Sequence, residues 1–344
     1  MKNDKKVLVL GATGAMGQYL VPILAQKGYC VDAVSLDDAS GLLPPGVRHI
    51  KTRVADYDNL AQLRKLMENN YDAIVDFMIY PTVKLQFFLP FFLKRTGQYV
   101  YLSSYRIYDD KEYPIRETSP RLIDTADDLI YRNSEDYGIF KARGENMLRA
   151  WPSRNWTVVR PAITYSYMRN QLVTLEAPLT VARAFAGKKV IVPREARNVQ
   201  TTMSWGGDVA RMIAELLFNE KALGEIFTVA TSEHHSWGEI ADYYKEICNL
   251  EAVWVDKCDY IKILCPDPDW YFGSIWPLDY DRLFNRVIDN SKILATTGIR
   301  QDELRKTFDG LAWEIGRAPR NLSKWPQMWA KQSERMDAYL AQMH

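Results

Sequence analysis

Tryptophan is missing from the first 150 residues of this 344-residue chain, although ten tryptophans occur between Trp151 and Trp329. Cysteine and histidine are scarce throughout, with four of each. The cysteines are too few for a disulfide framework and lack the two-residue spacing of a zinc site; they are Cys30, Cys248, Cys258 and Cys265. We therefore expect reduced thiols, a cytoplasmic location and no bound metal.

An excess of charge and a long apolar run are also missing. The 44 basic residues against 43 acidic residues give a net charge of +1, which disfavours nucleic acid and acidic membranes as partners because both attract strongly basic surfaces. The most apolar stretch, LQFFLPFFL at 85–93, is too short to cross a bilayer, and the start of the chain does not resemble a signal peptide. The sequence thus predicts a small-molecule partner and no membrane association.

Segments with strand-like and helix-like patterns alternate over the first 160 residues. Short apolar strands are predicted at 6–10, 30–36, 49–53, 73–77, 99–102 and 156–159. Helices are predicted between them at 16–27, 59–69, 83–94 and 135–150. This alternation is typical of a parallel sheet covered by helices on both faces. We therefore predict an α/β fold with a Rossmann-type doubly wound parallel sheet.

The regular alternation ends after Arg160-Pro161, and the tryptophans become frequent from there on. We predict a dinucleotide-binding domain over residues 1–165, which contains the catalytic residues. Residues 166–344 are predicted to form a small C-terminal domain that mainly binds substrate, with residues of about 205–230 returning to the sheet. The tail at 328–343 has apolar residues at helical spacing and is predicted to dock on the protein.

A glycine-rich loop, Gly11-Ala12-Thr13-Gly14-Ala15-Met16-Gly17, follows the first predicted strand and opens the first predicted helix. Glycines let the backbone approach a pyrophosphate, and the helix start supplies free N–H groups and partial positive charge. The loop therefore predicts a dinucleotide site. The residues expected to contact the cofactor here are Gly11, Thr13, Gly14, Ala15, Met16 and Gly17.

The end of the second predicted strand distinguishes NAD from NADP, because it meets the adenosine ribose. Ser35 and Asp37 stand there, and no arginine stands beside them to hold a 2′-phosphate. The sequence therefore favours NAD over NADP. Asp56, after the third strand, is predicted either to meet the adenine or to lie in a solvated turn.

A serine pair, a tyrosine and a lysine form the second group of functional candidates. Ser103-Ser104 follow the fifth predicted strand, while Tyr137 and Lys141 are one turn apart on a predicted helix and share a face. A free phenol has a pKa of about 10, which is too high for a base at neutral pH. A nearby ammonium group lowers that pKa, so the pattern predicts proton transfer by Tyr137.

These motifs resemble the extended short-chain dehydrogenases/reductases, which include the NAD-dependent epimerases and dehydratases of nucleotide sugars. Further matching segments are Arg160-Pro161, Gly207-Asp208-Val209-Ala210, and Asp289-Asn290-Ser291-Lys292 with Gly298. The resemblance implies that Ser104, Tyr137 and Lys141 are catalytic, with the tyrosine as acid/base and the lysine on the nicotinamide ribose. It also implies that Pro161 contacts the cofactor and that the protein forms homodimers through two helices per subunit.

Several positions depart from the family's pattern on the substrate side. The 4,6-dehydratases carry an Asp-Glu pair where this chain has Tyr105-Arg106, so dehydration is not expected. Ile163 stands where epimerases usually place an asparagine. Arg197 and Arg282 are candidates to clamp a diphosphate, with a solvated surface role as the alternative for each. The predicted substrate contacts are Tyr105, Arg106, Ile163, Arg197 and Arg282.

The function predicted from these observations is that of an NAD-dependent epimerase acting on a nucleotide-linked sugar through a transient ketone. One alternative is an NAD(P)H-dependent reductase or dehydrogenase with net redox turnover. The other is a non-catalytic NAD(P)-binding or RNA-associated protein of the same fold. The sequence names neither the sugar, nor its nucleotide, nor the carbon that is oxidised.

Overall fold

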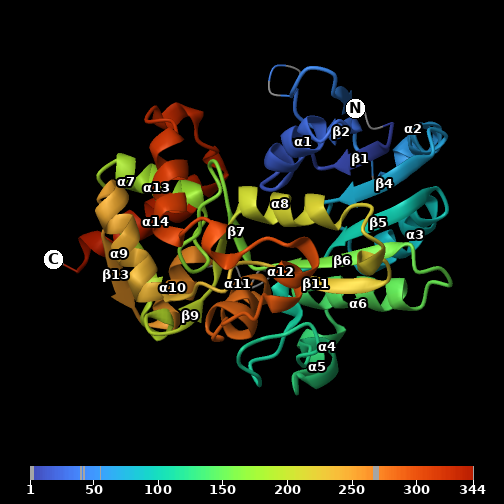
Figure 1. The fold of residues 1–344 in the computed structure, drawn as a ribbon. Coiled ribbons are helices and arrows are strands. Elements are labelled where there is room, and N and C mark those ends of the chain that lie inside the picture. The colour runs from blue at the N-terminus through green and yellow to red at the C-terminus, as the bar shows by residue number, and fades with distance from the viewer. Residues whose placement is uncertain (1–3, 39–40, 42, 55, 266–270, 344) are drawn as a thin grey trace.

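The computed structural model of the chain describes residues 4–38, 41, 43–54, 56–265 and 271–343 (Figure 1). Its largest element is a seven-stranded sheet with the strand order β11-β6-β5-β4-β1-β2-β3. All neighbouring strands in it are parallel. The strands are β1 (Lys6–Leu10), β2 (Cys30–Ser35), β3 (Arg48–Lys51), β4 (Tyr71–Asp76), β5 (Thr96–Leu102), β6 (Trp156–Pro161) and β11 (Glu225–Val229). The predicted Rossmann-type α/β fold is thereby confirmed.

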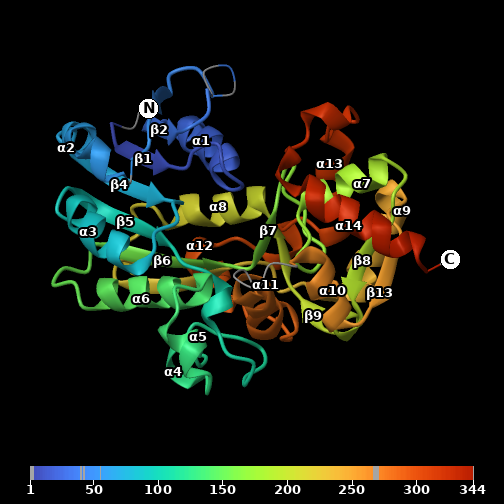
Figure 2. The same ribbon diagram turned by 180° about the vertical axis from the view of Figure 1, so that it is seen from behind.

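Two helical layers cover the sheet because its strands are apolar on both faces. Val7 and Val9 of β1 pack against helices on one side, while Leu8 and Leu10 pack against helices on the other, as the two-residue period of a strand requires. The first layer contains α1 (Gly17–Gln26), α8 (Gly206–Leu216) and α12 (Ser291–Thr297). The second contains α2 (Leu60–Met67), α3 (Thr82–Leu93) and α6 (Tyr137–Arg149). Figures 1 and 2 show the sheet between these layers.

Strand β11 joins the edge of the sheet beside β6 after a long excursion of the chain. The chain beyond β6 also contains three two-stranded sheets, which pair β7 (Ile163–Tyr165) with β10 (Met203–Trp205), β8 (Val190–Pro193) with β13 (Ala252–Val255), and β9 (Gln200–Thr201) with β12 (His235–Ser236). The helices in this part of the chain include α7 (Val181–Phe185), α9 (Trp237–Cys248), α10 (Lys257–Leu264) and α11 (Tyr271–Pro277). A separate apolar core holds this part of the chain together.

Helix α9 begins directly after Ser236, because Ser236 and Glu239 form a capping box. Helices α13 (Thr307–Arg317) and α14 (Ala330–Ala341) complete the C-terminal part. Figures 1 and 2 place α7, α9, α13 and α14 together at the end of the molecule opposite α2 and α3. Met336 of α14 is fully buried, so the predicted docking of the tail is confirmed.

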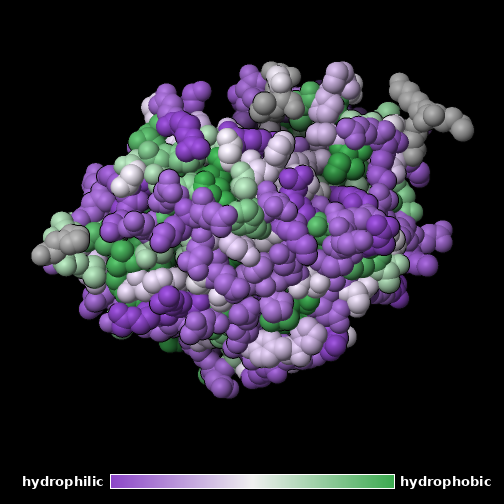
Figure 3. Space-filling view, turned by 60° about the vertical axis from the view of Figure 1, so that its left-hand side comes forward, coloured by the Kyte–Doolittle hydropathy of each residue, from purple (hydrophilic) through white to green (hydrophobic). Residues whose placement is uncertain are grey.

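Hydrophilic residues cover most of the face shown in Figure 3, where hydrophobic residues form small, separate patches. In the described part of the chain, no helix combines the length and apolarity that a membrane span needs.

Two short helices, α4 (Leu122–Thr125) and α5 (Leu129–Asn133), lie between β5 and α6 in the sequence. They belong to the segment that precedes the helix carrying Tyr137 and Lys141.

Candidate active site

The glycine loop forms a tight turn between β1 and α1. Gly11 adopts a positive φ of 82°, and the N–H of Gly14 donates to its carbonyl at 3.0 Å. A Cβ atom at Gly17 would lie 2.4 Å from that carbonyl oxygen, so only glycine fits there. The turn thereby brings backbone close to the start of α1, where N–H groups of the first turn lack helical partners. These features fit the pyrophosphate of a dinucleotide.

The residues predicted for the adenosine end lie beside this loop. Thr13 Oγ1 donates to Asp37 Oδ2 at 3.0 Å, which holds the carboxylate against the glycine turn. Ser35 Oγ donates to the carbonyl of Asp37 at 3.0 Å and lies 2.9 Å from His49 Nε2. Asp56 lies in a turn, where its carboxylate accepts a hydrogen bond from the N–H of Asp58 and caps the short 3₁₀ turn Tyr57–Asn59. This is the turn role that the sequence offered as the alternative to an adenine contact.

Ser104, Tyr137 and Lys141 meet where β5 ends and α6 begins. Ser104 lies just beyond β5, close enough to Tyr137, the first residue of α6, to work against the rise in the pKa of its phenol. Lys141 lies one turn further along the same face, with Nζ 5.6 Å from the centre of the Tyr137 ring. The chain thus brings together the three side chains that the sequence predicts to be catalytic.

Lys141 is fully buried, and its Nζ donates to the carbonyl oxygens of Leu102 at 2.6 Å and Met78 at 3.3 Å. Burial lowers the pKa of Lys141 to about 8, although the carboxylates of Asp76 and Glu145 oppose that change. The charge of this lysine therefore depends on two acidic groups that the sequence analysis did not single out. Asp76 ends β4, and Glu145 lies one helical turn after Lys141 on α6.

The two carboxylates are held by different networks. Asp76 accepts hydrogen bonds from the hydroxyls of Tyr80 at 2.9 Å and Tyr99 at 2.7 Å. Glu145 accepts one from Ser103 Oγ at 2.5 Å and pairs with Arg160 through Nε at 2.8 Å and Nη2 at 2.6 Å. A sequence signal existed for Glu145, since its spacing from Lys141 places both on one helix face. For Asp76 the signal was its place at a strand end in the parallel sheet.

Arg106 lies beside Tyr137, in the turn Tyr105–Ile107 that follows β5. Its Cζ is 5.4 Å from the centre of the Tyr137 ring, and its Nη2 donates to both carboxylate oxygens of Asp136 at 3.2 Å. Burial raises the pKa of Tyr137, while the charge of Arg106 and the hydrogen bond with Ser104 oppose that rise. The residue predicted to contact substrate therefore also faces the predicted acid/base.

The remaining predicted substrate residues fall into two groups. Arg282 donates to the Tyr105 hydroxyl at 3.0 Å. The carboxylate of Asp281 pairs with Arg282 and also lies 3.5 Å from Nε of Arg106. These four side chains therefore form one network. Among the described residues Arg197 does not belong to that network, because its guanidinium packs 5.7 Å from the ring of Trp254. Two further positions are buried in strands, Ile163 in β7 and Pro161 at the end of β6.

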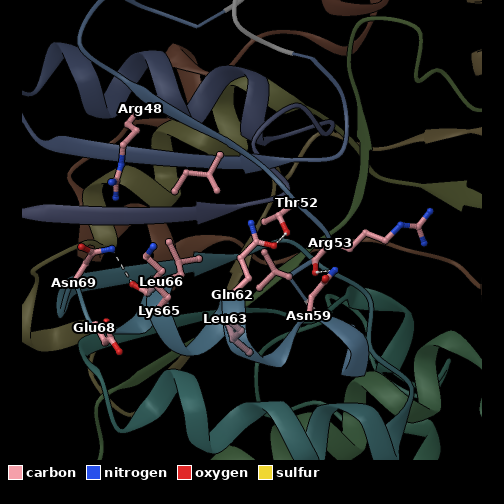
Figure 4. Close-up of a pocket in the computed structure, with 12 residues that line it drawn as sticks. Arg48, Thr52, Arg53, Asn59, Gln62, Leu63, Lys65, Leu66, Glu68 and Asn69 are labelled. Carbon is pink, nitrogen blue, oxygen red and sulfur yellow. Dashed lines mark hydrogen bonds between the residues drawn. The ribbon is translucent and has the colours of Figure 1, made fainter.

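A pocket of about 410 Å³ lies elsewhere, between β3 and α2 (Figure 4). Thr52 donates to Gln62 across it at 2.6 Å, and Asn59 donates to the carbonyl of Arg53 at 3.2 Å. None of the predicted cofactor, catalytic or substrate residues lines it. Over the part of the chain that the structure describes, no group of three or more His, Cys, Asp and Glu side chains could hold a metal ion.

Comparison with known proteins gives one family match and one curated relative. The model of the NAD dependent epimerase/dehydratase family matches residues 7–87, which include the glycine loop. The chloroplast stem-loop binding protein of 41 kDa b from Arabidopsis thaliana is 23% identical over 252 residues, which cover 70% of this chain. The match covers 62% of that relative, so the chain spans less than two thirds of its length.

Two solved structures illustrate the likeness of the fold. An epimerase of Methanothermobacter thermautotrophicus has a TM-score of 0.70 at 13% identity, covering 98% of this chain and 95% of its own. The UDP-glucose 4-epimerase of Thermus thermophilus, in complex with NAD, has a TM-score of 0.66 at 18% identity, covering 91% and 100%. The resemblance predicted from the motifs is confirmed to this extent: residues 7–87 match the NAD dependent epimerase/dehydratase family, and the whole chain shares its fold with these two epimerases.

Proposed function

We propose that this protein is an NAD-dependent epimerase-type oxidoreductase that acts on a nucleotide-linked sugar. The observation that carries the proposal is the meeting of Ser104, Tyr137 and Lys141 where β5 ends and α6 begins. The carboxyl end of β1, where the glycine loop begins, lies at the same edge of the parallel sheet. A dinucleotide in a doubly wound sheet binds at this edge. The likeness to a UDP-glucose 4-epimerase crystallised with NAD supports the same reading.

The cofactor would be held by residues 11–17, with Asp37 on the adenosine ribose and Lys141 on the nicotinamide ribose. The carboxylate of Asp37 lies beside the loop and accepts a hydrogen bond from Thr13. There it would accept hydrogen bonds from the ribose hydroxyls and repel a 2′-phosphate. We therefore propose NAD as the preferred cofactor. When bound, NAD would supply a reversible hydride acceptor for the carbon that is oxidised.

Tyr137 would act as the base and then as the acid. Its phenolate takes the proton of a sugar hydroxyl whose oxygen is held by Ser104, and loss of the hydride leaves a ketone. After the ketone turns in the site, Tyr137 gives the proton back to the same oxygen as the C–H bond forms again. The sugar is inverted at one carbon, and no net redox change results.

The substrate would lie between the two parts of the chain. We propose that residues 1–165 hold the dinucleotide and the proton-transfer groups, while residues 166–344 mainly bind the nucleotide and sugar. Arg282 donates to Tyr105, and Asp281 links Arg282 to Arg106; Tyr105, Arg106 and Arg282 are proposed substrate contacts. Ile163 and Arg197 complete the proposed set. The absence of the Asp-Glu pair at 105–106 argues against 4,6-dehydration.

The protein is also proposed to form a homodimer in the cytoplasm. Helix α3 carries apolar side chains on its outer face, with Val83 72% and Phe87 40% exposed, and Ile79 just before the helix is 60% exposed. A second copy of the same surface would bury them, which would stabilise association by the hydrophobic effect.

The four cysteines form no disulfide, which supports the proposed cytoplasmic location because that compartment is reducing.

Mass spectrometry of ligands released from the purified protein, followed by a screen of sugar nucleotides, tests the proposed reaction. We expect bound NAD, an epimerised product, and loss of turnover in Tyr137→Phe. A steady change in the absorbance of reduced nicotinamide would identify a net reductase or dehydrogenase instead. Absence of bound NAD, or full activity in Tyr137→Phe, would contradict the mechanism.

A second candidate function is RNA association without sugar turnover. The observation that favours it is the curated relative, which is named as a stem-loop binding protein. A mobility-shift titration with a stem-loop RNA distinguishes the two functions. RNA binding that survives in Tyr137→Phe, in a protein that turns over none of the screened sugar nucleotides, would favour the RNA role.

A further inference from the structure

The two halves of the glycine loop are held by different parts of the chain. The first half rests on the sheet, because the N–H groups of Gly11 and Ala12 donate to the carbonyl oxygen of Val34 in β2 at 3.0 and 2.9 Å. The second half leads into the first turn of α1 and contacts residues from beyond position 200. This half includes the helix start that would face a pyrophosphate, so its neighbours bear on the affinity of that site.

Gly206, the first residue of α8, packs directly on the second half of the loop. A Cβ atom at Gly206 would lie 2.6 Å from the carbonyl oxygen of Ala15 and 3.2 Å from the ring of Tyr19 in α1. The residue before it, Trp205, packs edge to face on Tyr19, with the ring centres 5.2 Å apart. Trp205 and Gly206 thus pack against the loop and the first turn of α1.

A carboxylate of α13 joins these side chains. Glu314 Oε1 accepts a hydrogen bond from the Tyr19 hydroxyl at 2.5 Å and another from Trp205 Nε1 at 2.6 Å. Its Oε2 accepts a third from Arg317 at 2.9 Å. The Glu314 side chain is fully buried, and a carboxylate is stable away from water only where such partners hold it. Glu314, Tyr19 and Trp205 therefore form one bonded unit.

This unit bridges two separate apolar cores. Leu311 and Ile315 of α13 lie in the core of the C-terminal part, whereas Leu20 of α1 lies in the core under the first helical layer. Figures 1 and 2 place α13 with α7, α9 and α14, away from α2 and α3. Glu314 thus connects a helix that the C-terminal core holds to the helix that follows the glycine loop.

We propose that Glu314 is a positioning residue for the pyrophosphate site: through Tyr19 and Trp205 it holds the second half of the glycine loop, so that the C-terminal part of the chain sets the affinity for the dinucleotide. The inference rests on the proposed function, which supplies the dinucleotide as the ligand. The substrate is proposed to bind between the same two parts. A shift of α13 on substrate binding would therefore change dinucleotide affinity, and the dinucleotide would change substrate affinity by the same factor.

Fluorescence titration of the full chain with NADH tests the proposal. Glu314→Leu removes the acceptor for both donors and should weaken NADH binding by about fivefold or more, the lower end of the coupling between linked sites. Glu314→Gln keeps a carbonyl oxygen for Tyr19 and Trp205 and should lose less affinity. Asp337→Asn is the matched control, because it removes the charge that pairs with the buried Arg183, and it should bind NADH as the parent does.

Hydrogen–deuterium exchange of the ligand-free protein separates positioning from a general loss of stability. In Glu314→Leu we expect faster exchange of the amides of residues 14–20, because the first turn of α1 loses its bonded neighbour. In Asp337→Asn the faster exchange should be confined to α14 and its contacts. Tyr19→Phe and Trp205→Phe each remove one donor and should act in the same direction as Glu314→Leu. Tyr19→Phe added to Glu314→Leu should weaken NADH binding no further, since the bond is already lost.

Parent-like NADH affinity in Glu314→Leu, an equal loss in Glu314→Gln, or unchanged exchange over residues 14–20 overturns the proposal. Circular dichroism shows whether Glu314→Leu folds. If it does not, the exchange of Tyr19→Phe and Trp205→Phe decides: parent-like exchange over residues 14–20 in both overturns the proposal, and faster exchange in either supports it. A parent chain that binds no dinucleotide contradicts the proposed function, while faster exchange in Glu314→Leu would still support the link between Glu314 and the loop.

Discussion

Glu145 of α6 and Arg160 of β6 form a two-pronged ion pair in which both side chains are fully buried. The pair joins the helix that carries Tyr137 and Lys141 to the strand beside β5. Arg160 Nη1 also donates to the Tyr108 hydroxyl at 2.7 Å, and Ser103 donates to Glu145, so the pair lies within a larger network. Buried charges of this kind are stable only while each keeps its partner.

Substituting Glu145 by glutamine is therefore expected to destabilise the protein by about 3–5 kcal/mol, because Arg160 is left buried without its counter-charge. Urea unfolding followed by circular dichroism measures the loss. The matched control is Glu225→Gln, which removes the charge of the solvent-accessible partner of Arg154 and Lys292 and should change the unfolding free energy by at most about 1 kcal/mol. Similar losses in both variants would contradict the assignment.

The same pair predicts the direction of acid sensitivity. Burial works against ionisation of Glu145, but Arg160 and Ser103 outweigh it and hold the pKa of Glu145 below its ordinary value of 4.5. The stability contributed by this group is thus present above pH 4.5 and is lost as the pH falls below that value and through the pKa of the folded state. Unfolding free energies measured from pH 6 to pH 3 should fall less steeply in Glu145→Gln than in the parent chain.

Replacing Gly17 by alanine should abolish NAD binding and lower stability, because the added Cβ would collide with the backbone oxygen of Gly11 at 2.4 Å. Titration of the protein with NADH, followed by fluorescence, measures the binding. Gly316→Ala in α13 is the control, since a Cβ there meets nothing within 4 Å and its affinity should equal that of the parent. Parent-like binding by Gly17→Ala would exclude the loop as the pyrophosphate site.

Asp37 should determine the choice between the two nicotinamide dinucleotides. We expect Asp37→Ser to weaken NADH binding and to strengthen NADPH binding, because the carboxylate that repels a 2′-phosphate is gone. The ratio of the two dissociation constants is the measurement. Asp56→Ser serves as a control, because Asp56 caps a turn and should leave the ratio unchanged. A parent ratio that already favours NADPH would contradict the proposed role of Asp37.

The proposed dimer depends on the outer face of α3. Introducing a charge with Val83→Lys or Phe87→Lys should convert the dimer to a monomer in light scattering coupled to size-exclusion chromatography, since two lysines would meet in the apolar contact. Ile130→Lys in α5 changes a residue that is 65% exposed outside this face and should leave the mass unaltered. A parent chain that is already monomeric at high concentration would exclude the interface.

Much of the fold follows from local patterns in the sequence. The strands and helices of the first 160 residues lie within a few residues of their predicted bounds, because apolar periodicity, the glycine loop and turn residues act over short stretches of chain. Helix α9 likewise has local signals at both ends, since Ser236 and Glu239 form its capping box and Asn249 ends it in a left-handed conformation. The irregular part beyond Pro161 was predicted less completely, because its three small sheets pair strands that are distant in sequence.

The sequence by itself determined the glycine loop and the one-turn spacing of Tyr137 and Lys141, because both depend on neighbours in the chain. Only the tertiary structure decided which charges surround them. Asp76 reaches Lys141 from β4, and Arg106 reaches Tyr137 from the turn after β5. Electrostatic effects depend on distance and burial rather than on order in the sequence. The acidity of the proposed catalytic pair is therefore a property of packing between separate strands and one helix.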